Sequence, residues 1–190
     1  MKLSRKFYSR NTKLVAKELL GKILVHKTKE GVCKGRIVET EAYFGEKDPG
    51  SHACVGKTKR NYLMFENPGK SYVYFCYGNH WLFNVVATEK IGKPGAVLIR
   101  ALEPLEGIEI MKIRRKVEDD INISNGPGKL TKALDIDKRH NGLDLTKNNL
   151  FIENSNEKIK IANTNRIGIS KGKEKLLRFY IKNNDFVSKK

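Results

Sequence analysis

The stretch Arg36-Ile37-Val38-Glu39-Thr40-Glu41-Ala42-Tyr43 predicts a β-strand that carries two carboxylates. Alternate residues of a strand lie on one face, so Glu39 and Glu41 share a face with Ile37 and Tyr43. Two carboxylates on such a face are unfavourable unless they are solvated, paired or used in chemistry. A carboxylate in a water-poor pocket is a good general base, because desolvation raises its proton affinity. A solvated or salt-bridged strand face is the alternative, and for glutamates in general it is the commoner case.

Apolar runs and turn signals on both sides of this strand predict an antiparallel sheet with a few helices. We expect strands at 23–26, 32–43, 71–77, 80–88 and 96–102, and further short strands after about residue 151. Helices are predicted at 11–20, from Glu103-Pro104 through the basic run 112–116, and at 129–134. Gly78-Asn79 predicts a hairpin with a two-residue turn. The pattern predicts one α+β domain over residues 1–190, with a mostly antiparallel β-sheet core, flanking helices and a protruding β-hairpin.

The charge of the chain points to an anionic partner. Lys and Arg number 38 and Asp and Glu 21, which gives a formal net charge of +17. Such a field attracts nucleic acid, because each neutralised phosphate releases counterions. Codon bias is the alternative explanation, since Lys, Asn and Ile are abundant together, as in proteins of A+T-rich bacterial genomes. The charge alone therefore favours nucleic-acid binding without assigning a function.

The composition also predicts the compartment. No run of about 18 apolar residues is present, and the basic N-terminus lacks the apolar stretch of a signal peptide. We therefore expect a cytoplasmic protein that makes no membrane contact. The three cysteines, Cys33, Cys54 and Cys76, are odd in number and widely spaced, which argues against a disulfide framework and against a zinc site. We expect reduced thiols, no metal and no cofactor.

Aromatic residues are concentrated between Tyr72 and Trp81, where five rings, or six with His80, occupy ten positions. Aromatic faces stack on bases, and a bulky side chain at a hairpin tip can wedge into a base stack. The alternative is a tyrosine-rich core strand, which strand propensity favours. Tyr77, beside the Gly78-Asn79 turn, fits that alternative least well.

Two further features stand out. Arg100 is a charge at the end of the apolar run 97–99, where a buried strand is expected. Gly126-Pro127-Gly128 precedes a predicted helix, so its backbone N–H groups could face a DNA phosphate. An ordinary turn and helix cap is the alternative, and the local sequence alone favours it.

In this order along the chain, these residues resemble the alkyladenine (3-methyladenine) DNA glycosylase family. The first matching block is 35–43, and the similarity spans roughly residues 16–145. The other matching positions are Asp48, His52, Asn67-Pro68-Gly69, Tyr72-Val73-Tyr74, Tyr77-Gly78, Asn84, the run 98–107, and Asn125-Gly126-Pro127-Gly128-Lys129-Leu130.

The resemblance implies a DNA glycosylase that flips alkylated or deaminated purines out of double-stranded DNA. It implies that Glu41 activates the water that attacks the sugar, while Arg100 and His52 hold that water. It implies no lysine nucleophile, so we expect simple hydrolysis that leaves an abasic site. We expect the enzyme to act as a monomer.

The resemblance also implies the residues that bind DNA. Tyr43, Tyr74 and His52 would stack on the flipped base, and Asn84 would disfavour the amino group of normal guanine. The remaining implied contacts are Tyr77 as the residue that fills the gap in the duplex, and Gly126, Gly128 and Lys129 on the DNA backbone. The serine that usually precedes Gly-Pro in the family is Asn125 here. The resemblance therefore implies a contact from the backbone of this segment to DNA, but no contact from the side chain at position 125.

A rival hypothesis is a non-catalytic, basic RNA- or ribosome-binding protein that uses the same aromatic residues for stacking. It accounts for the charge and for the tyrosines. It does not account for Glu41, because a carboxylate on a binding face repels phosphate.

Overall fold

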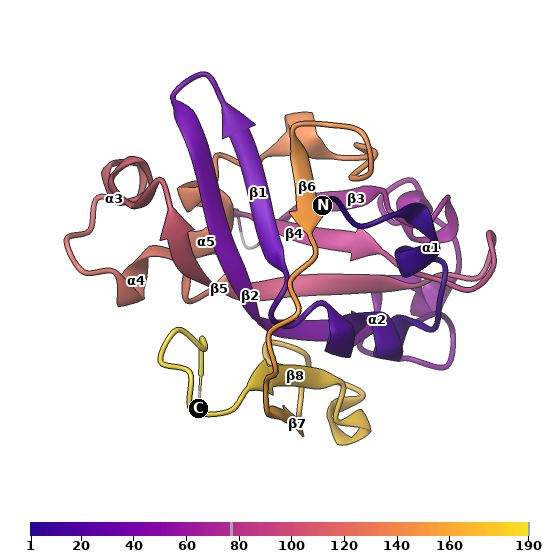
Figure 1. Ribbon diagram of the computed structural model, residues 1–190. Coiled ribbons are helices and arrows are strands. Elements are labelled where there is room, and N and C mark those ends of the chain that lie inside the picture. The colour runs from indigo at the N-terminus through magenta and orange to yellow at the C-terminus, as the bar shows by residue number, and fades with distance from the viewer. Residues whose placement is uncertain (77, 190) are drawn as a thin grey trace.

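An eight-stranded antiparallel sheet is the centre of the computed structural model, which describes residues 1–76 and 78–189 (Figure 1). The main path of the sheet is β3-β4-β5-β2-β1-β6, and β8 pairs with both β2 and β7. The strands are β1 (Ile23–Thr28), β2 (Gly31–Tyr43), β3 (Ser71–Cys76), β4 (His80–Val86), β5 (Ala96–Glu106), β6 (Leu150–Glu153), β7 (Ile161–Thr164) and β8 (Arg178–Ile181). The predicted α+β class with an antiparallel core is confirmed.

Strand β2 organises the sheet because it pairs with three other strands. Strand β5 runs along one edge of β2, from the pair Lys34–Glu106 to the pair Tyr43–Ala96. On the other edge, β1 pairs with the first part of β2 and β8 pairs with residues 39–41. Strand β8 therefore lies beside the two carboxylates of β2, and β7 pairs with the other edge of β8, at the bottom of Figure 1.

The helices gather at the two ends of the sheet, with α1 and α2 on the right of Figure 1 and α3 to α5 on the left. They are α1 (Arg5–Tyr8), α2 (Thr12–Glu18), α3 (Ile108–Arg115), α4 (Ile121–Ser124) and α5 (Pro127–Ala133). The predicted helix at 11–20 is α2, and Asn11 caps it by accepting a hydrogen bond from the Lys13 N–H at 3.0 Å. No helix in the described part of the chain is long and apolar enough to cross a membrane.

The main core lies between one face of the sheet and the helices. Buried side chains of α2, β2, β4 and β5 pack together there, among them Val15, Ile37, Phe83 and Ile99. Phe179 of β8 belongs to the same cluster and has no exposed surface. Strand β8 is therefore part of the core and not an appendage to it.

The prediction that Glu103-Pro104 opens a helix is wrong. Strand β5 continues to Glu106, and α3 begins only at Ile108. Pro104 lies opposite Gly35, where the register of the two strands shifts at a bulge, a place where a residue without an N–H is tolerated. Gly107 then turns the chain with φ +74°, and a Cβ at this residue would lie 2.4 Å from the Val32 carbonyl oxygen.

The predicted hairpin is formed by β3 and β4 at one edge of the sheet. Its last pair is Cys76–His80, so three positions and not two separate the strands. Gly78 has φ +71°, a conformation that glycine adopts without strain. Tyr77, the predicted wedge, lies outside the described residues.

Phe179→Ala should destabilise the protein strongly, because it removes a fully buried aromatic ring from the main core. Truncation of such a ring costs about 3–5 kcal/mol of unfolding free energy. Urea denaturation followed by circular dichroism measures the change. Ile113→Ala, at a side chain that is 77% exposed on α3, is the control and should have little effect. Equal small losses in both variants would contradict the placement of β8 in the core.

Candidate active site

A cavity of about 660 Å³ opens on the face of the sheet opposite the main core. Its walls combine neighbouring strands with two loops and the start of α5. The lining residues include Tyr43 of β2, Tyr72, Tyr74 and Cys76 of β3, Leu82 and Asn84 of β4, Leu98 and Arg100 of β5, His52, the segment 167–169, and Gly126 to Lys129. Strands far apart in the sequence thus bring the predicted aromatic and charged residues to one place.

Glu41 lies directly behind the wall of this cavity and has no exposed surface. One carboxylate oxygen, Oε2, accepts hydrogen bonds from the Tyr43 hydroxyl at 2.6 Å and from Arg100 Nη1 at 3.3 Å. The other, Oε1, accepts from the Ile167 backbone N–H at 2.8 Å. Burial raises the pKa of Glu41 above the usual 4.5, although Arg100, Tyr43 and Ile167 act in the opposite direction. Such a carboxyl has the properties of a general base.

The two carboxylates of β2 share one arginine. Arg100 Nε lies 3.3 Å from Glu39 Oε1, while its Nη1 contacts Glu41. Arg100 is itself almost completely buried, which explains the charge that the sequence places in an apolar strand. The alternative interpretation of these carboxylates, a salt-bridged strand face, is also correct in part, since both glutamates form buried salt bridges.

Three rings form one aromatic wall of the cavity. The ring of His52, in the 3₁₀ turn His52–Val55, lies edge-on to Tyr74 with ring centroids 4.7 Å apart, and Tyr72 lies 5.1 Å from Tyr74. The His52 Nδ1 and the Tyr72 hydroxyl are 3.0 Å apart. Burial, and then the charge of Arg60, lower the pKa of His52 below 6.5. The lowered pKa favours the neutral imidazole at pH 7. The ring of His52 contacts these tyrosines, whereas Glu41 contacts Tyr43, Arg100 and the Ile167 N–H.

Tyr43 connects the cavity to the buried carboxylate, since its ring lines the cavity and its hydroxyl donates to Glu41. The guanidinium of Arg166 lies over the Tyr43 ring, 4.7 Å from its centroid. Arg166 is fully buried and forms two hydrogen bonds with the Asp48 carboxylate, at 2.6 and 2.8 Å. Although burial opposes it, this pairing holds the pKa of Asp48 below its usual value. Arg166 and Asp48 thus fix one face of the Tyr43 ring.

Asn84 is oriented by the backbone of the neighbouring strand. Its Nδ2 donates to the Tyr72 carbonyl at 3.0 Å, so the amide has a defined direction at the floor of the cavity. This contact is between paired residues, because Tyr72 lies opposite Asn84 in the β3–β4 ladder.

The start of α5 forms the opposite rim of the cavity. A Cβ on Gly128 would lie 2.7 Å from the His80 ring, so glycine lets the helix approach β4 closely. Gly126 is extended, with φ 177°, and has room for a side chain. The Lys129 ammonium donates to the side-chain oxygens of Asn122 and Asn125, at 3.0 and 2.7 Å.

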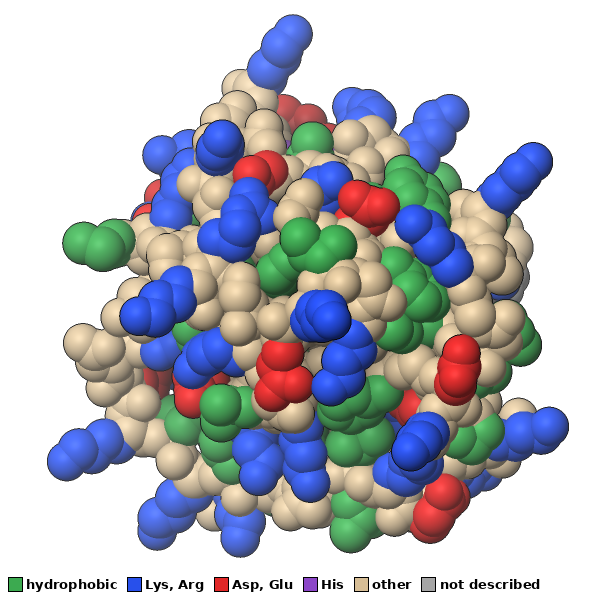
Figure 2. Space-filling model, turned by 90° about the vertical axis from the view of Figure 1, so that its right-hand side faces the viewer, with side chains coloured by type: hydrophobic (Ala, Val, Ile, Leu, Met, Phe, Trp, Pro, Cys, Tyr) green, Lys and Arg blue, Asp and Glu red, His purple; other side chains and the backbone are tan. Residues whose placement is uncertain are grey.

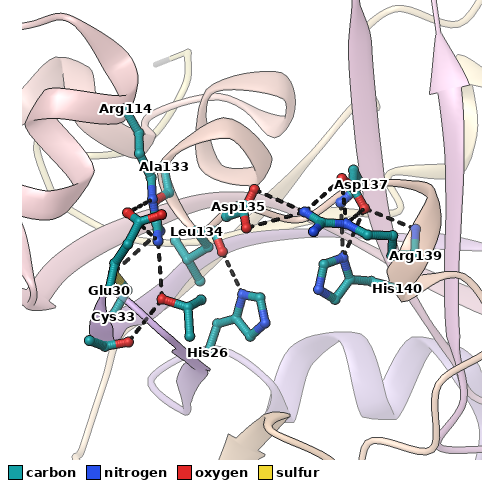
Figure 3. Close-up of polar contacts among 12 residues, drawn as sticks. His26, Glu30, Cys33, Arg114, Ala133, Leu134, Asp135, Asp137, Arg139 and His140 are labelled. Atoms are coloured by element: carbon teal, nitrogen blue, oxygen red, sulfur yellow. Dashed lines mark hydrogen bonds and ion pairs between the residues drawn. The ribbon is translucent and has the colours of Figure 1, made fainter.

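The far end of α5 is anchored by two basic side chains (Figure 3). Arg114 Nη1 donates to the Ala133 carbonyl at 3.0 Å, and His26 Nδ1 lies 2.6 Å from the Leu134 carbonyl oxygen. Donors at the last carbonyls of a helix satisfy groups that have no partner within the helix. These contacts tie α5 to α3 and β1, and so set the position of its first residues at the cavity.

Sequence reasoning missed several residues that contact Glu39, Glu41 and Tyr43. Arg166 and the Ile167 N–H come from the loop before β8, and Arg178 of β8 pairs with Glu39 at 2.6 Å. Arg178 could have been found as Arg100 was, because it too is a charged residue within an apolar run, 177–181. No group of three or more His, Cys, Asp or Glu side chains that could hold a metal ion occurs among residues 1–76 and 78–189.

Known proteins share this sequence over nearly its whole length. A family model described as methylpurine-DNA glycosylase (MPG) matches residues 6–185. A protein of Prosthecochloris aestuarii is 52% identical over 188 residues, which are 97% of this chain and 90% of that protein. Proteins of Carboxydothermus hydrogenoformans and Clostridium acetobutylicum are 49% and 47% identical, covering 100% and 99% of this chain and 100% and 98% of their own lengths. All three carry the provisional name 3-methyladenine DNA glycosylase.

Asp48→Ala should lower the free energy of unfolding markedly, because it leaves the buried guanidinium of Arg166 without its counter-charge. Breaking a buried ion pair by removal of one partner costs about 3–5 kcal/mol. Guanidinium chloride denaturation measures the loss. Glu89→Ala, which removes the partner of the exposed Lys93, is the control and should change stability little. If both variants unfolded like the unmodified protein, the Asp48–Arg166 pair would not support the site.

Proposed function

Because the chain belongs to the methylpurine-DNA glycosylase family, we propose that this DNA N-glycosylase flips a damaged purine out of duplex DNA into the cavity. Glu41 then acts as the general base for hydrolysis of the N-glycosidic bond. The observation that carries the proposal is the position of Glu41, fully buried behind an aromatic cavity and beside Arg100. We propose further that residues 1–190 act as one glycosylase domain and as a monomer.

The aromatic rings would hold the extruded base. Tyr43 on one side and His52 with Tyr74 on the other would stack on the purine, and the oriented amide of Asn84 would select against the amino group of guanine. Alkylated and deaminated purines, the 3-methyladenine class, are the proposed substrates. A neutral His52 supports stacking on a cationic base, because it adds no charge to the wall.

The chemistry needs one water molecule and one proton acceptor. The water oxygen forms a bond to the sugar C1′, the C1′–N bond breaks, and the purine leaves with the bonding electrons. Glu41 accepts the water proton, and for this its Oε2 must exchange the hydrogen bond of the Tyr43 hydroxyl for one from water. Arg100, at 3.3 Å from the same oxygen, would help to hold that water, with His52 at the cavity side. A cationic purine leaves without protonation, whereas a neutral one must first accept a proton.

The contacts with DNA outside the cavity are also proposals. Tyr77 would fill the gap left in the duplex, and Lys129 with the backbone of Gly126 and Gly128 would contact the DNA backbone. The net charge of +17 supports sequence-independent binding. Figure 2 shows Lys and Arg spread over one face of the molecule, with a few acidic side chains between them. A non-catalytic RNA-binding protein would have no use for a buried carboxylate behind its stacking residues.

Glu41→Gln should abolish excision while duplex binding survives, because the amide keeps the shape of the side chain and removes the proton acceptor. General-base catalysis contributes about 10²–10⁴-fold to a rate. Single-turnover release of 7-methylguanine measures the loss, and a gel shift on duplex DNA with an abasic-site analogue measures binding. Glu106→Gln, at an exposed carboxylate on β5, is the matched control. Undiminished release by Glu41→Gln would move the chemistry to another residue, and borohydride trapping of an enzyme–DNA adduct would identify a lysine nucleophile instead.

The rate of excision should fall in acid because only ionised Glu41 accepts a proton. The pKa of Glu41 is raised, chiefly by burial, so the midpoint of the acid limb should lie above 4.5. 7-Methylguanine in duplex DNA is the substrate of choice, since its leaving group is cationic already and needs no protonation. A single-turnover rate that stayed constant down to pH 4.5 would show that no buried carboxylate limits the reaction.

A further inference from the structure

Glu39 is the second buried carboxylate of β2, and the reaction proposed above does not use it directly. It has no exposed surface. Its oxygens accept hydrogen bonds from Arg178 Nε at 2.6 Å and from Arg100 Nε at 3.3 Å. They also accept from the Ser188 backbone N–H at 2.7 Å and from the Ser188 hydroxyl at 3.0 Å. Strands β5 and β8 and the C-terminal segment therefore meet on one carboxylate.

The C-terminal segment 186–189 is docked against the sheet beside Glu39. Val187 is only 6% exposed and packs with Val38 and Ala101, the chain neighbours of Glu39 and Arg100. Arg178 holds the same segment by donating to the Lys189 carbonyl. Packing and hydrogen bonds thus hold the Ser188 N–H in position to donate to the Glu39 carboxylate.

Arg100 transmits this arrangement to Glu41. Its Nε contacts Glu39 and its Nη1 contacts Glu41, both at 3.3 Å. The guanidinium is a rigid plane, so a partner that fixes Nε also fixes the direction of Nη1. When both glutamates are ionised, their two negative charges balance the two positive charges of Arg100 and Arg178.

We propose that Glu39 is a positioning residue for the excision reaction, and that the docked C-terminal segment, through Ser188 and Arg178, holds Glu39 so that Arg100 stays aligned on Glu41. This inference rests on the proposed function. It assigns a role in the active site to residues 186–189, none of which lines the cavity.

The charges around Glu41 give this role a measurable signature. Glu41 faces Glu39 and Tyr43 from its own strand, Tyr74 from β3 and Arg100 from β5. Arg166 and the Ile167 N–H face it from the loop before β8. Removal of the Glu39 charge leaves an excess positive charge beside Glu41, which favours its ionised form. The pKa of Glu41 should therefore fall, since Glu39 is one of the groups that raise it.

The test compares Glu39→Gln and Ser188→Pro with the unmodified enzyme in single-turnover excision of 7-methylguanine. Glu39→Gln removes the charge, and Ser188→Pro removes the N–H that Glu39 accepts. A misplacement of about 1 Å at a reacting group can cost about 100-fold in rate, so we expect losses of about 10- to 100-fold. Binding to abasic-site DNA should be unchanged, and the acid limb of Glu39→Gln should move to lower pH.

Two further variants separate positioning from general damage to the fold. Ser188→Thr keeps both donors and should restore most of the rate. Lys182→Ala, at an exposed side chain in the turn between β8 and this segment, should excise normally. Normal rates and an unshifted pH profile in Glu39→Gln and Ser188→Pro would overturn the inference alone. So would a rate loss that merely follows the loss of folded, DNA-binding protein. An unmodified enzyme that leaves the substrate intact would overturn the proposed function and the inference with it.

Discussion

Glu39 and Glu41 reach the same guanidinium from one strand, and neither carboxylate has exposed surface. Charges in a water-poor interior are tolerated only where opposite charges and hydrogen bonds surround them. The partners come from β5, β8, the loop before β8 and the C-terminal segment. The pairing of β5 and β8 with β2, and the docking of the C-terminal segment beside it, therefore satisfy these two groups.

The burial of the two carboxylates also separates the residues proposed to bind the base from the residue proposed to catalyse its release. Aromatic side chains line the cavity, while the proposed base lies one layer behind them, and Tyr43 belongs to both layers through its ring and its hydroxyl. A ligand that shifts the Tyr43 ring also shifts a hydrogen bond of Glu41. Arg166 and Asp48, buried behind that ring, limit how far it can move.

Local patterns in the sequence predicted much of this arrangement. Alternation along β2 placed Glu39 and Glu41 together, and the runs at β3, β4 and β5 predicted the strands that carry Tyr74, Asn84 and Arg100. Partners more than 120 positions away, such as Ile167 and Ser188, were missed. Their donors are backbone N–H groups, which nearly every residue has, so no residue type in the sequence indicates them. Pro104 misled the prediction since its bulge depends on pairing with Gly35, a contact between two strands.

The most direct test of this account is a crystal structure of the Glu41→Gln protein bound to duplex DNA that contains hypoxanthine. The account predicts the purine outside the helix, stacked between Tyr43 and the pair His52 and Tyr74, with its C1′ one water molecule away from the side chain of residue 41. A purine that remained in the duplex, or that lay at the α5 rim with its C1′ turned away from residue 41, would contradict the assignment of Glu41 as the catalytic base.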